Sequence, residues 1–396
     1  MNIFKYIPIG FIGIIFFSTN CITPFEPLGV QDTAGILVVE GMILETGTTI
    51  KLSRTVEINT KSDFEMEDLS HARVQVIDDG NNVVAVAEQQ IIDEKINPGT
   101  YVVNSKITFT PGMKYALAIQ IGEKQYQSSF VSPVRTPEID AITWKFYDDK
   151  SMDIMVSTHD PEGEINYYRW AFEEDWEIQA AYFSPFVYDP LNRTLIEQSL
   201  TDPNNTYYCW DSDVSKSILL GASDQYTEAV IKNKRIHRIL PDNSRFSFLY
   251  SILVKQYGIE KEAYHYFENV QKNIEQSGSI FSPQPSEIRG NINCLSNPDE
   301  PVIGYIVATK EVVARIFIDM ETNEGEDWHN CGDLYEFSFA NLFAAYINGL
   351  GISYVYTDEE QEDEVFIYVC APLRCTDCTQ RGGTKNKPDF WPNDHQ

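Results

Sequence analysis

The sequence is short of basic residues: 30 lysines and arginines stand against 59 aspartates and glutamates, a formal net charge of -29. Nucleic acids and anionic membrane surfaces select basic patches, so this balance argues against a partner of either kind held by charge. Long apolar runs are also scarce. After residue 17 no stretch approaches the roughly 20 apolar residues that cross a bilayer, so we expect a soluble, folded body.

Catalytic motifs are lacking as well. The six histidines show no His-x-x-x-His or His-Glu-x-x-His spacing, and no Gly-x-Ser-x-Gly or phosphate loop occurs. Glu173, Glu174, Asp175 and Glu177 could suggest paired carboxylates for glycoside hydrolysis. On an alternating strand they point to both faces, so no pair can be assigned. We expect no enzyme, no cofactor and no metal; a hydrolase whose site the sequence hides is an alternative.

What is present begins with an export signal. Lys5 precedes an apolar run over residues 7–17, which is too short to span a membrane, and small polar residues lead to Cys21. This order predicts a lipoprotein signal peptide over residues 1–20, a lipid on Cys21 and a tether over residues 21–35. The alternative is an ordinary cleaved signal with an incidental cysteine, which Asn20 favours because Gly, Ala or Ser usually stands there.

The seven cysteines become an even number once Cys21 is set aside for lipid. In an exported chain disulfides are the default, and six cysteines allow three bridges with unknown connectivity. Zinc, which Cys331, Cys370, Cys375 and Cys378 with His329 could ligate, and a redox role for the last two cysteines are less favoured readings. The disulfide candidates are Cys209, Cys294, Cys331, Cys370, Cys375 and Cys378.

The sequence pattern predicts a β-sandwich domain over residues 36–132. Short alternating strands are divided by Gly, Pro and Asp-Gly turns. The cues Ala72-x-Val74-x-Val76, Gly99-x-Tyr101 and Pro111-Gly112-x-x-Tyr115 resemble prealbumin-like or Ig-like modules, which usually scaffold or dock. Two prolines, Pro133 and Pro137, then frame what we interpret as a stiff, exposed link.

For residues 138–396 the sequence pattern predicts a larger β-rich domain with one long amphipathic helix and a Cys-rich tail. The helix spans residues 260–276, where Ala263, Phe267, Val270 and Ile274 are spaced as one buried stripe. The fold class is therefore mostly β.

Two clusters within this domain allow a binding role. Tyr207, Tyr208 and Trp210 lie in a Pro-rich, aromatic segment, which indicates either a packed satellite core or contact with a ligand or partner. Residues 358–364 carry six carboxylates. No Asp-x-Asp-x-Asp-Gly loop accompanies them, so a solvated hairpin tip is favoured over a cation site.

Several motifs together resemble one family. They are Tyr167-Tyr168-Arg169-Trp170, Phe281-x-Pro283-Gln284-Pro285, Gly290-Asn291-Ile292 and Cys375-Thr376-Asp377-Cys378 followed by Gly382-Gly383. The sequence is similar in these motifs to Bacteroidota lipoproteins of domain of unknown function 4249, over essentially all of the mature chain. The resemblance implies an outer-membrane lipoprotein, commonly paired with a TonB-dependent transporter, and no known catalytic residues.

From the sequence and this resemblance we expect a non-catalytic accessory or substrate-capture subunit of such a transporter. Its partners would be the lipid anchor, the transporter and an unknown substrate, with no nucleic acid. The cell surface is favoured over the periplasmic face of the outer membrane, although only Glu26 represents the acidic run that directs such proteins outward. A surface adhesin or structural envelope protein without a transporter is the alternative.

Overall fold

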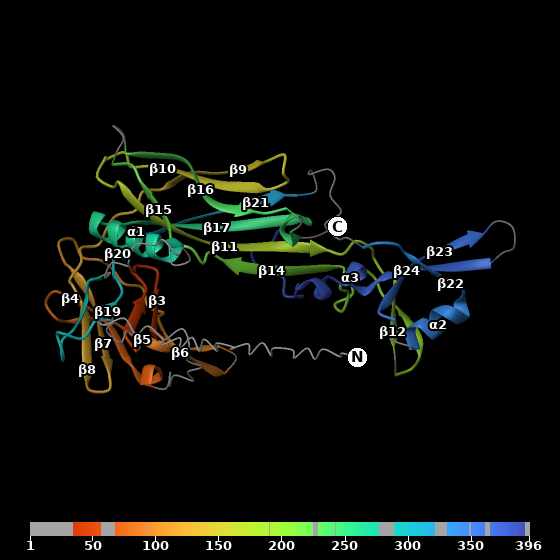
Figure 1. Ribbon diagram of the computed structural model, residues 1–396, viewed down its shortest axis with the longest axis horizontal. Helices are drawn as coiled ribbons and strands as arrows, with labels where there is room; N and C mark the ends of the chain where they lie inside the picture. The colour runs from red at the N-terminus through yellow and green to blue at the C-terminus, as the bar shows by residue number, and fades with distance from the viewer. Residues whose placement is uncertain are drawn as a thin grey trace, which may run out of the picture.

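The protein is elongated and mostly β, as predicted, with its parts arranged along one axis in the computed structural model (Figure 1). The structure describes residues 35–56, 68–92, 94–189, 191–224, 229–241, 243–276, 289–320, 331–347, 350–360 and 365–392. The predicted leader, its cleavage point and Cys21 lie outside these ranges.

A nine-stranded sheet, called here the first sheet, forms one end of the molecule. Its strand order is β18-β8-β7-β4-β5-β6-β3-β1-β19. The strands in chain order are β1 (Leu37–Glu40), β3 (Thr48–Arg54), β4 (Arg73–Asp78), β5 (Val83–Ile92), β6 (Lys95–Val103), β7 (Tyr115–Ile121), β8 (Lys124–Ser128), β18 (Ile292–Cys294) and β19 (Val302–Ile303). A short 3-10 turn, η1 (Asp68–His71), precedes β4.

The first sheet folds over on itself at β5 and encloses one apolar core. β5 pairs with β4 through residues 83–87 and with β6 through residues 88–92. Alternating residues point inward, as in β3, where Ile50 and Leu52 are buried between exposed neighbours. Tyr101 fixes η1 to this core: its hydroxyl donates to Leu69 O at 2.6 Å and accepts from Ala72 N at 2.8 Å. The sandwich expected for residues 36–132 is thereby present.

The predicted division of the chain differs from the structure in one respect. β18 and β19 come from the range assigned to the second domain, yet they pair with β8 and β1 and cover both edges of the first sheet. Open edges expose unpaired backbone groups, which explains why a distant segment returns to cover them. Gly290 and Gly304 allow this return because a Cβ on Gly290 would lie 1.6 Å from Gly304 O.

The link between Pro133 and Pro137 is also fastened rather than exposed. Val134 N donates to Ala308 O, and the buried Thr136 hydroxyl donates to Lys310 O at 2.5 Å and accepts from Gly258 N at 2.8 Å. The short strand β20 (Ala308–Thr309), which supplies one of these partners, pairs in turn with β2 (Ile43–Leu44). The two parts of the chain are therefore joined by buried backbone contacts.

Two sheets stack in the middle of the molecule (Figure 1). One has the order β16-β10-β9, and the other, the β11 sheet, has the order β14-β11-β17-β21 with β15 also paired to β11. Their strands are β9 (Ile139–Phe146), β10 (Met152–His159), β11 (Tyr167–Gln179), β14 (Tyr208–Val214), β15 (Leu219–Ala222), β16 (Val230–Ile239), β17 (Leu249–Gly258) and β21 (Glu311–Asp319). A 3-10 turn, η2 (Ser244–Phe246), leads into β17.

Helix α1 (Lys261–Gln276) confirms the predicted helix and lies where the first sheet meets the β11 sheet. Ala263 and Phe267 are buried in a cluster with Tyr257 of β17 and Val307 beside β20. Ile274, predicted as the last member of the buried stripe, is instead 65% exposed. Among the described residues, the cluster that buries the first turns of the helix does not extend to Ile274.

A small terminal sheet, in the order β22-β24-β23, forms the other end of the molecule. Its elements are β22 (Tyr335–Phe337), β23 (Ile352–Glu360), β24 (Val365–Pro372) and helix α2 (Phe339–Ile347), with hairpin β12 (Phe186–Asp189) and β13 (Thr194–Glu197) beside them. The chain closes through α3 (Leu373–Thr376) and η3 (Cys378–Arg381). The tip of the acidic turn, residues 361–364, lies outside the described residues.

Candidate functional site

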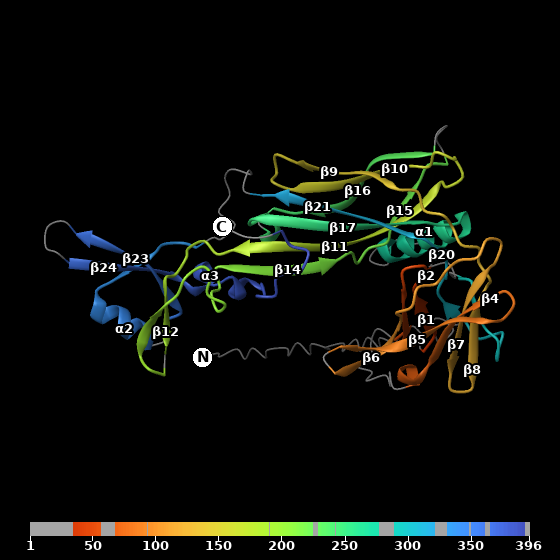
Figure 2. The same cartoon turned by 180° about the vertical axis from the view of Figure 1, so that it is seen from behind.

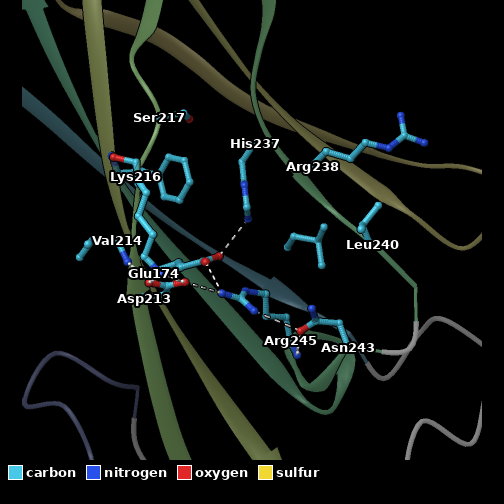
Figure 3. Close-up of a pocket in the computed structure, with 13 residues that line it drawn as sticks. Glu174, Asp213, Val214, Lys216, Ser217, His237, Arg238, Leu240, Asn243 and Arg245 are labelled. Carbon is cyan, nitrogen blue, oxygen red and sulfur yellow. Dashed lines mark hydrogen bonds and ion pairs between the residues drawn. The ribbon is translucent and has the colours of Figure 1, made fainter. Parts of the chain in front are cut away.

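A pocket of mixed polar and apolar lining opens between the two central sheets, around Glu174 of β11 (Figure 3). It has a volume of about 360 Å³ and is lined by β11, β14, β16 and η2. A second hollow of about 530 Å³ adjoins it and shares Asp213, Lys216, Asn243 and Arg245. We call the two together the Glu174 pocket.

Alternation along β11 places Glu174 in this pocket. Every second side chain of the strand, from Tyr168 to Trp176, faces the core, and Glu174 falls on that face at 2% exposed. A buried carboxylate is costly unless charged or polar partners surround it. Three groups do so here, and each comes from a different element.

Arg245, Tyr250 and His237 surround the carboxylate. Arg245 donates to Glu174 Oε1 at 2.5 Å, and the Tyr250 hydroxyl donates to Oε2 at 2.7 Å. His237 Nε2 lies 3.2 Å from Oε2, an ion-pair distance without the angle of a hydrogen bond. The His237 ring packs against Phe172 with centroids 4.6 Å apart.

Electrostatics keep Glu174 ionised. Burial alone raises the pKa of Glu174, but His237, Arg245 and Tyr250 outweigh it and lower the pKa to about 2. Burial and the neighbouring carboxylate raise the pKa of Tyr250 well above its usual range, so the phenol remains a donor. Neither group is poised to exchange a proton near neutral pH.

Arg245 links the buried carboxylate to the pocket mouth. Its guanidinium stacks 3.9 Å from the centre of the Trp176 ring and reaches Asp213 Oδ2 at 3.4 Å. Asn243 caps η2 by accepting from Arg245 N, which holds the start of this turn in place. Asp213 also pairs with the exposed Lys216 at 2.9 Å. The charges of Glu174, Arg245, Asp213 and Lys216 therefore offset one another, and the rim of the pocket offers polar groups to a ligand.

The other acidic residues of β11 have structural partners away from the pocket. Glu173 pairs with Lys255, and Asp175 lies 3.0 Å from Arg315. Glu177, 1% exposed, accepts from Trp391 Nε1 at 3.1 Å beneath the C-terminal tail. The inference that these residues point to both faces holds, and no pair of them shares one cavity.

The structure forms two of the predicted disulfides. Cys209 of β14 is bonded to Cys378 of η3, and Cys331 is bonded to Cys375 of α3. Gly383 permits the first, since a Cβ there would lie 2.5 Å from the Cβ of Cys209.

Cys294 and Cys370, two of the six disulfide candidates, form no disulfide in the structure. Both are free and buried. Cys294 belongs to β18 in the first sheet, whereas Cys370 belongs to β24 in the terminal sheet. They occupy opposite ends of the molecule and cannot approach each other (Figure 2).

The aromatic candidates Tyr207, Tyr208 and Trp210 form a half-buried cluster outside the Glu174 pocket. The rings of Tyr207 and Tyr208 are 4.8 Å apart, and Tyr208 lies 6.0 Å from Phe248. Trp210 exchanges backbone hydrogen bonds with Thr384 of the C-terminal tail. Their packing is established, and contact with a ligand or partner stays a prediction.

Sequence reasoning missed the residues that complete the pocket. His237, Arg245 and Asp213 come from three segments far from Glu174, and none stands in a motif. The one available signal was the alternation of β11, which puts Glu174 on the apolar face. A carboxylate buried there needs a cationic partner, but the alternation does not identify which residue provides it.

In the part of the chain that the structure describes, no group of three His, Cys, Asp or Glu side chains is placed to hold an ion. Across the same ranges, no helix combines the length and apolar character needed to cross a membrane.

The fold and the site define a mostly β, disulfide-linked chain with a charge-neutralised polar pocket between two sheets. More particularly, the chain belongs to the family described as domain of unknown function (DUF4249), which matches residues 22–315. No curated protein matches it. Among solved structures it is similar to a mutant of Salmonella alpha-2-macroglobulin, at 8% identity and a TM-score of 0.16, over 85% of this chain and 16% of that one. The chain thus spans a small part of that protein, and we draw no conclusion about the fold from this likeness.

Proposed function

We propose that this protein is an outer-membrane lipoprotein, anchored through Cys21, that serves a TonB-dependent transporter as a non-catalytic accessory or substrate-capture subunit. The observation that carries the binding role is the Glu174 pocket. Its buried carboxylate is held ionised by His237, Arg245 and Tyr250, and Asp213 pairs with Arg245 and Lys216 at the rim. Such an arrangement can position a polar ligand by hydrogen bonds, while neither Glu174 nor Tyr250 is poised to transfer a proton near neutral pH.

The two disulfides support placement in the cell envelope. Disulfides persist in oxidising compartments and are rare in the cytosol. Cys209–Cys378 and Cys331–Cys375 both fasten the C-terminal part of the chain, which lies beyond residue 315, where the family match ends. An exported chain with a signal and a cysteine at position 21 fits attachment to a membrane by lipid.

The anchor is tested by Cys21→Ser in the native host. We expect the variant to move from the membrane fraction to the soluble fraction, while Cys370→Ser, which alters a buried thiol in the terminal sheet, stays with the membrane. Sedimentation of the Cys21→Ser protein with membranes at the wild-type level would contradict the anchor.

The partner is tested by purification of the detergent-solubilised wild-type protein. Recovery of a TonB-dependent barrel in stoichiometric amount is the expected result. A monomer that binds extracellular matrix and no barrel would indicate an adhesin instead, and turnover of a glycan or peptide panel would indicate a hydrolase. Either outcome would replace the transporter proposal.

A further inference from the structure

A second pocket lies at the base of the terminal sheet, where the β12–β13 hairpin and α3 meet β23 (Figure 1). It has a volume of about 340 Å³, within the range of ligand sites in proteins. Among the described residues, it shares none of its lining with the Glu174 pocket. We call it the terminal pocket.

Buried hydrogen bonds hold the walls of the terminal pocket in place. The Ser353 hydroxyl of β23 donates to Ser184 Oγ at 2.8 Å, and the Ser184 hydroxyl donates to Phe186 O at 2.8 Å. Gln198 Nε2, beyond the other strand of the hairpin, donates to Ser184 O at 2.8 Å. On the opposite wall, the disulfide at Cys375 fastens α3. The pocket is therefore formed before a ligand arrives, which lowers the entropic cost of binding.

Three exposed aliphatic side chains line the terminal pocket. Val187 of β12, Leu350 before β23 and Leu373 of α3 are 47%, 54% and 38% exposed. A backbone hydrogen bond from Leu373 N to Gly351 O at 2.9 Å brings the last two segments together. Isolated exposed aliphatic residues are common on protein surfaces, but three that line one hollow favour a ligand with an apolar group.

The charge of the terminal pocket is of one sign. Asp377 is acidic, and no Lys, Arg or His is among the described lining residues. Asp377 Oδ1 accepts from the backbone N and the hydroxyl of Thr379 at 3.0 and 2.6 Å, whereas Oδ2 has no hydrogen bond or ion pair within the described residues. Lys385 interacts electrostatically with Asp377, but its ammonium donates to Pro203 O and Asn205 O. The pocket therefore disfavours anions such as fatty acids and favours a cation beside the apolar group.

The remaining polar groups suit a peptide backbone. Gln198 uses its amide nitrogen within the protein, so its Oε1 can accept from an N–H, and the Thr206 hydroxyl can donate to a carbonyl. The two aromatic rings of the lining, Tyr188 and Tyr346, stack on each other with centroids 4.8 Å apart. Each ring thereby covers one face of the other, which favours a peptide over a saccharide that needs an open aromatic face.

We propose that the terminal pocket binds a peptide segment in which a bulky aliphatic side chain stands next to a lysine or arginine. The aliphatic group packs between Val187, Leu350 and Leu373, and the cation pairs with Asp377. This site goes beyond the proposed transporter role, because it requires neither the lipid anchor nor a barrel.

The probe is the peptide acetyl-Gly-Leu-Lys-Gly-amide, and the protein is residues 21–396 with Cys21→Ser, which needs no detergent. Binding is measured by equilibrium dialysis. We expect this peptide to bind about tenfold more tightly than acetyl-Gly-Gly-Lys-Gly-amide, which lacks the aliphatic group, or acetyl-Gly-Leu-Glu-Gly-amide, which reverses the charge.

Two variants locate the peptide in the terminal pocket. Leu350→Ser with Leu373→Ser should weaken binding of the Leu-Lys peptide about tenfold. Asp377→Asn should remove the preference over the Leu-Glu peptide, while its amide oxygen can still cap η3. The matched control is Leu191→Ser with Ile347→Ser, which changes two exposed aliphatic residues at the same end outside the lining; it should bind as the parent does.

Absence of binding by the parent, or equal affinity for the Leu-Lys and Leu-Glu peptides, would overturn the proposal. Unchanged binding by the variant of Leu350 and Leu373 would do the same. So would loss of binding in Lys216→Ala, which alters the rim of the Glu174 pocket, since the peptide would then be held there. These outcomes are independent of the anchor and the barrel, which cell fractionation and co-purification test on their own.

Discussion

In the first sheet one continuous cluster of apolar side chains, from Leu37 in β1 to Ala308 in β20, fills the space between the folded halves. The region around β11 is assembled differently. Its buried apolar residues fall into separate clusters, and Glu174 and Glu177 lie among them at 2% and 1% exposed. Both disulfides belong to this region and none to the first sheet. Where a single apolar core is incomplete, covalent links and ion pairs supply stability.

The largest expected effect comes from the longer covalent link. Cys209 and Cys378 are 169 residues apart, so Cys209→Ser with Cys378→Ser frees a long loop in the unfolded chain and should lower the free energy of unfolding by about 4 kcal/mol. The six tryptophans all follow residue 138, so denaturant unfolding followed by tryptophan fluorescence reports the second region.

The control for this prediction is Cys294→Ala, which removes an equally buried thiol from the first sheet. It should leave the tryptophan transition unshifted because it changes neither the disulfides nor the region that fluoresces. Addition of reductant should lower the stability of the parent and have less effect on the double variant. If the parent and the double variant have equal midpoints of denaturant unfolding, the proposed difference in how the two regions are stabilised is wrong.

Acid should act on the second region through Glu174. Its pKa is about 2 in the folded protein and near 4.5 when unfolded, so its contribution is complete above pH 4.5 and is lost as pH falls toward 2. The difference corresponds to about 3 kcal/mol. Asp160, Asp213 and other carboxylates with lowered pKa values add to the loss, so a variant is needed to isolate this one.

That variant is Glu174→Gln, compared by tryptophan-monitored unfolding at pH 6 and pH 3. We expect the parent to lose about 2 kcal/mol more than the variant between these two pH values, because the amide cannot titrate. Glu197→Gln, which changes an exposed carboxylate on β13, should keep the pH dependence of the parent. The role assigned to Glu174 fails if its amide variant shows the same slope as Glu197→Gln.

The same contrast explains how far sequence reasoning could go. The strands of residues 36–132, helix α1 and the β23–β24 hairpin follow from periodicity and turn residues, because each buries a regular face. The return of β18 and β19 to the first sheet could not be predicted, since pairing between distant segments leaves no local pattern. The partners of Glu174 and the pairing of Cys209 with Cys378 are likewise set by tertiary approach.

The smallest expected effect tests the one place where a regular pattern misled. Periodicity assigned Ile274 to the buried stripe of α1, but it is 65% exposed, so Ile274→Ala should change the free energy of unfolding by less than about 0.5 kcal/mol. Phe267 lies two turns earlier on the same face of the helix. Phe267→Ala removes its buried ring and should lower the free energy of unfolding by about 3 kcal/mol. Both variants are compared by denaturant unfolding. A cost for Ile274→Ala near that of Phe267→Ala would mean that the stripe is buried along its whole length, and that the junction covered by α1 extends past Val270.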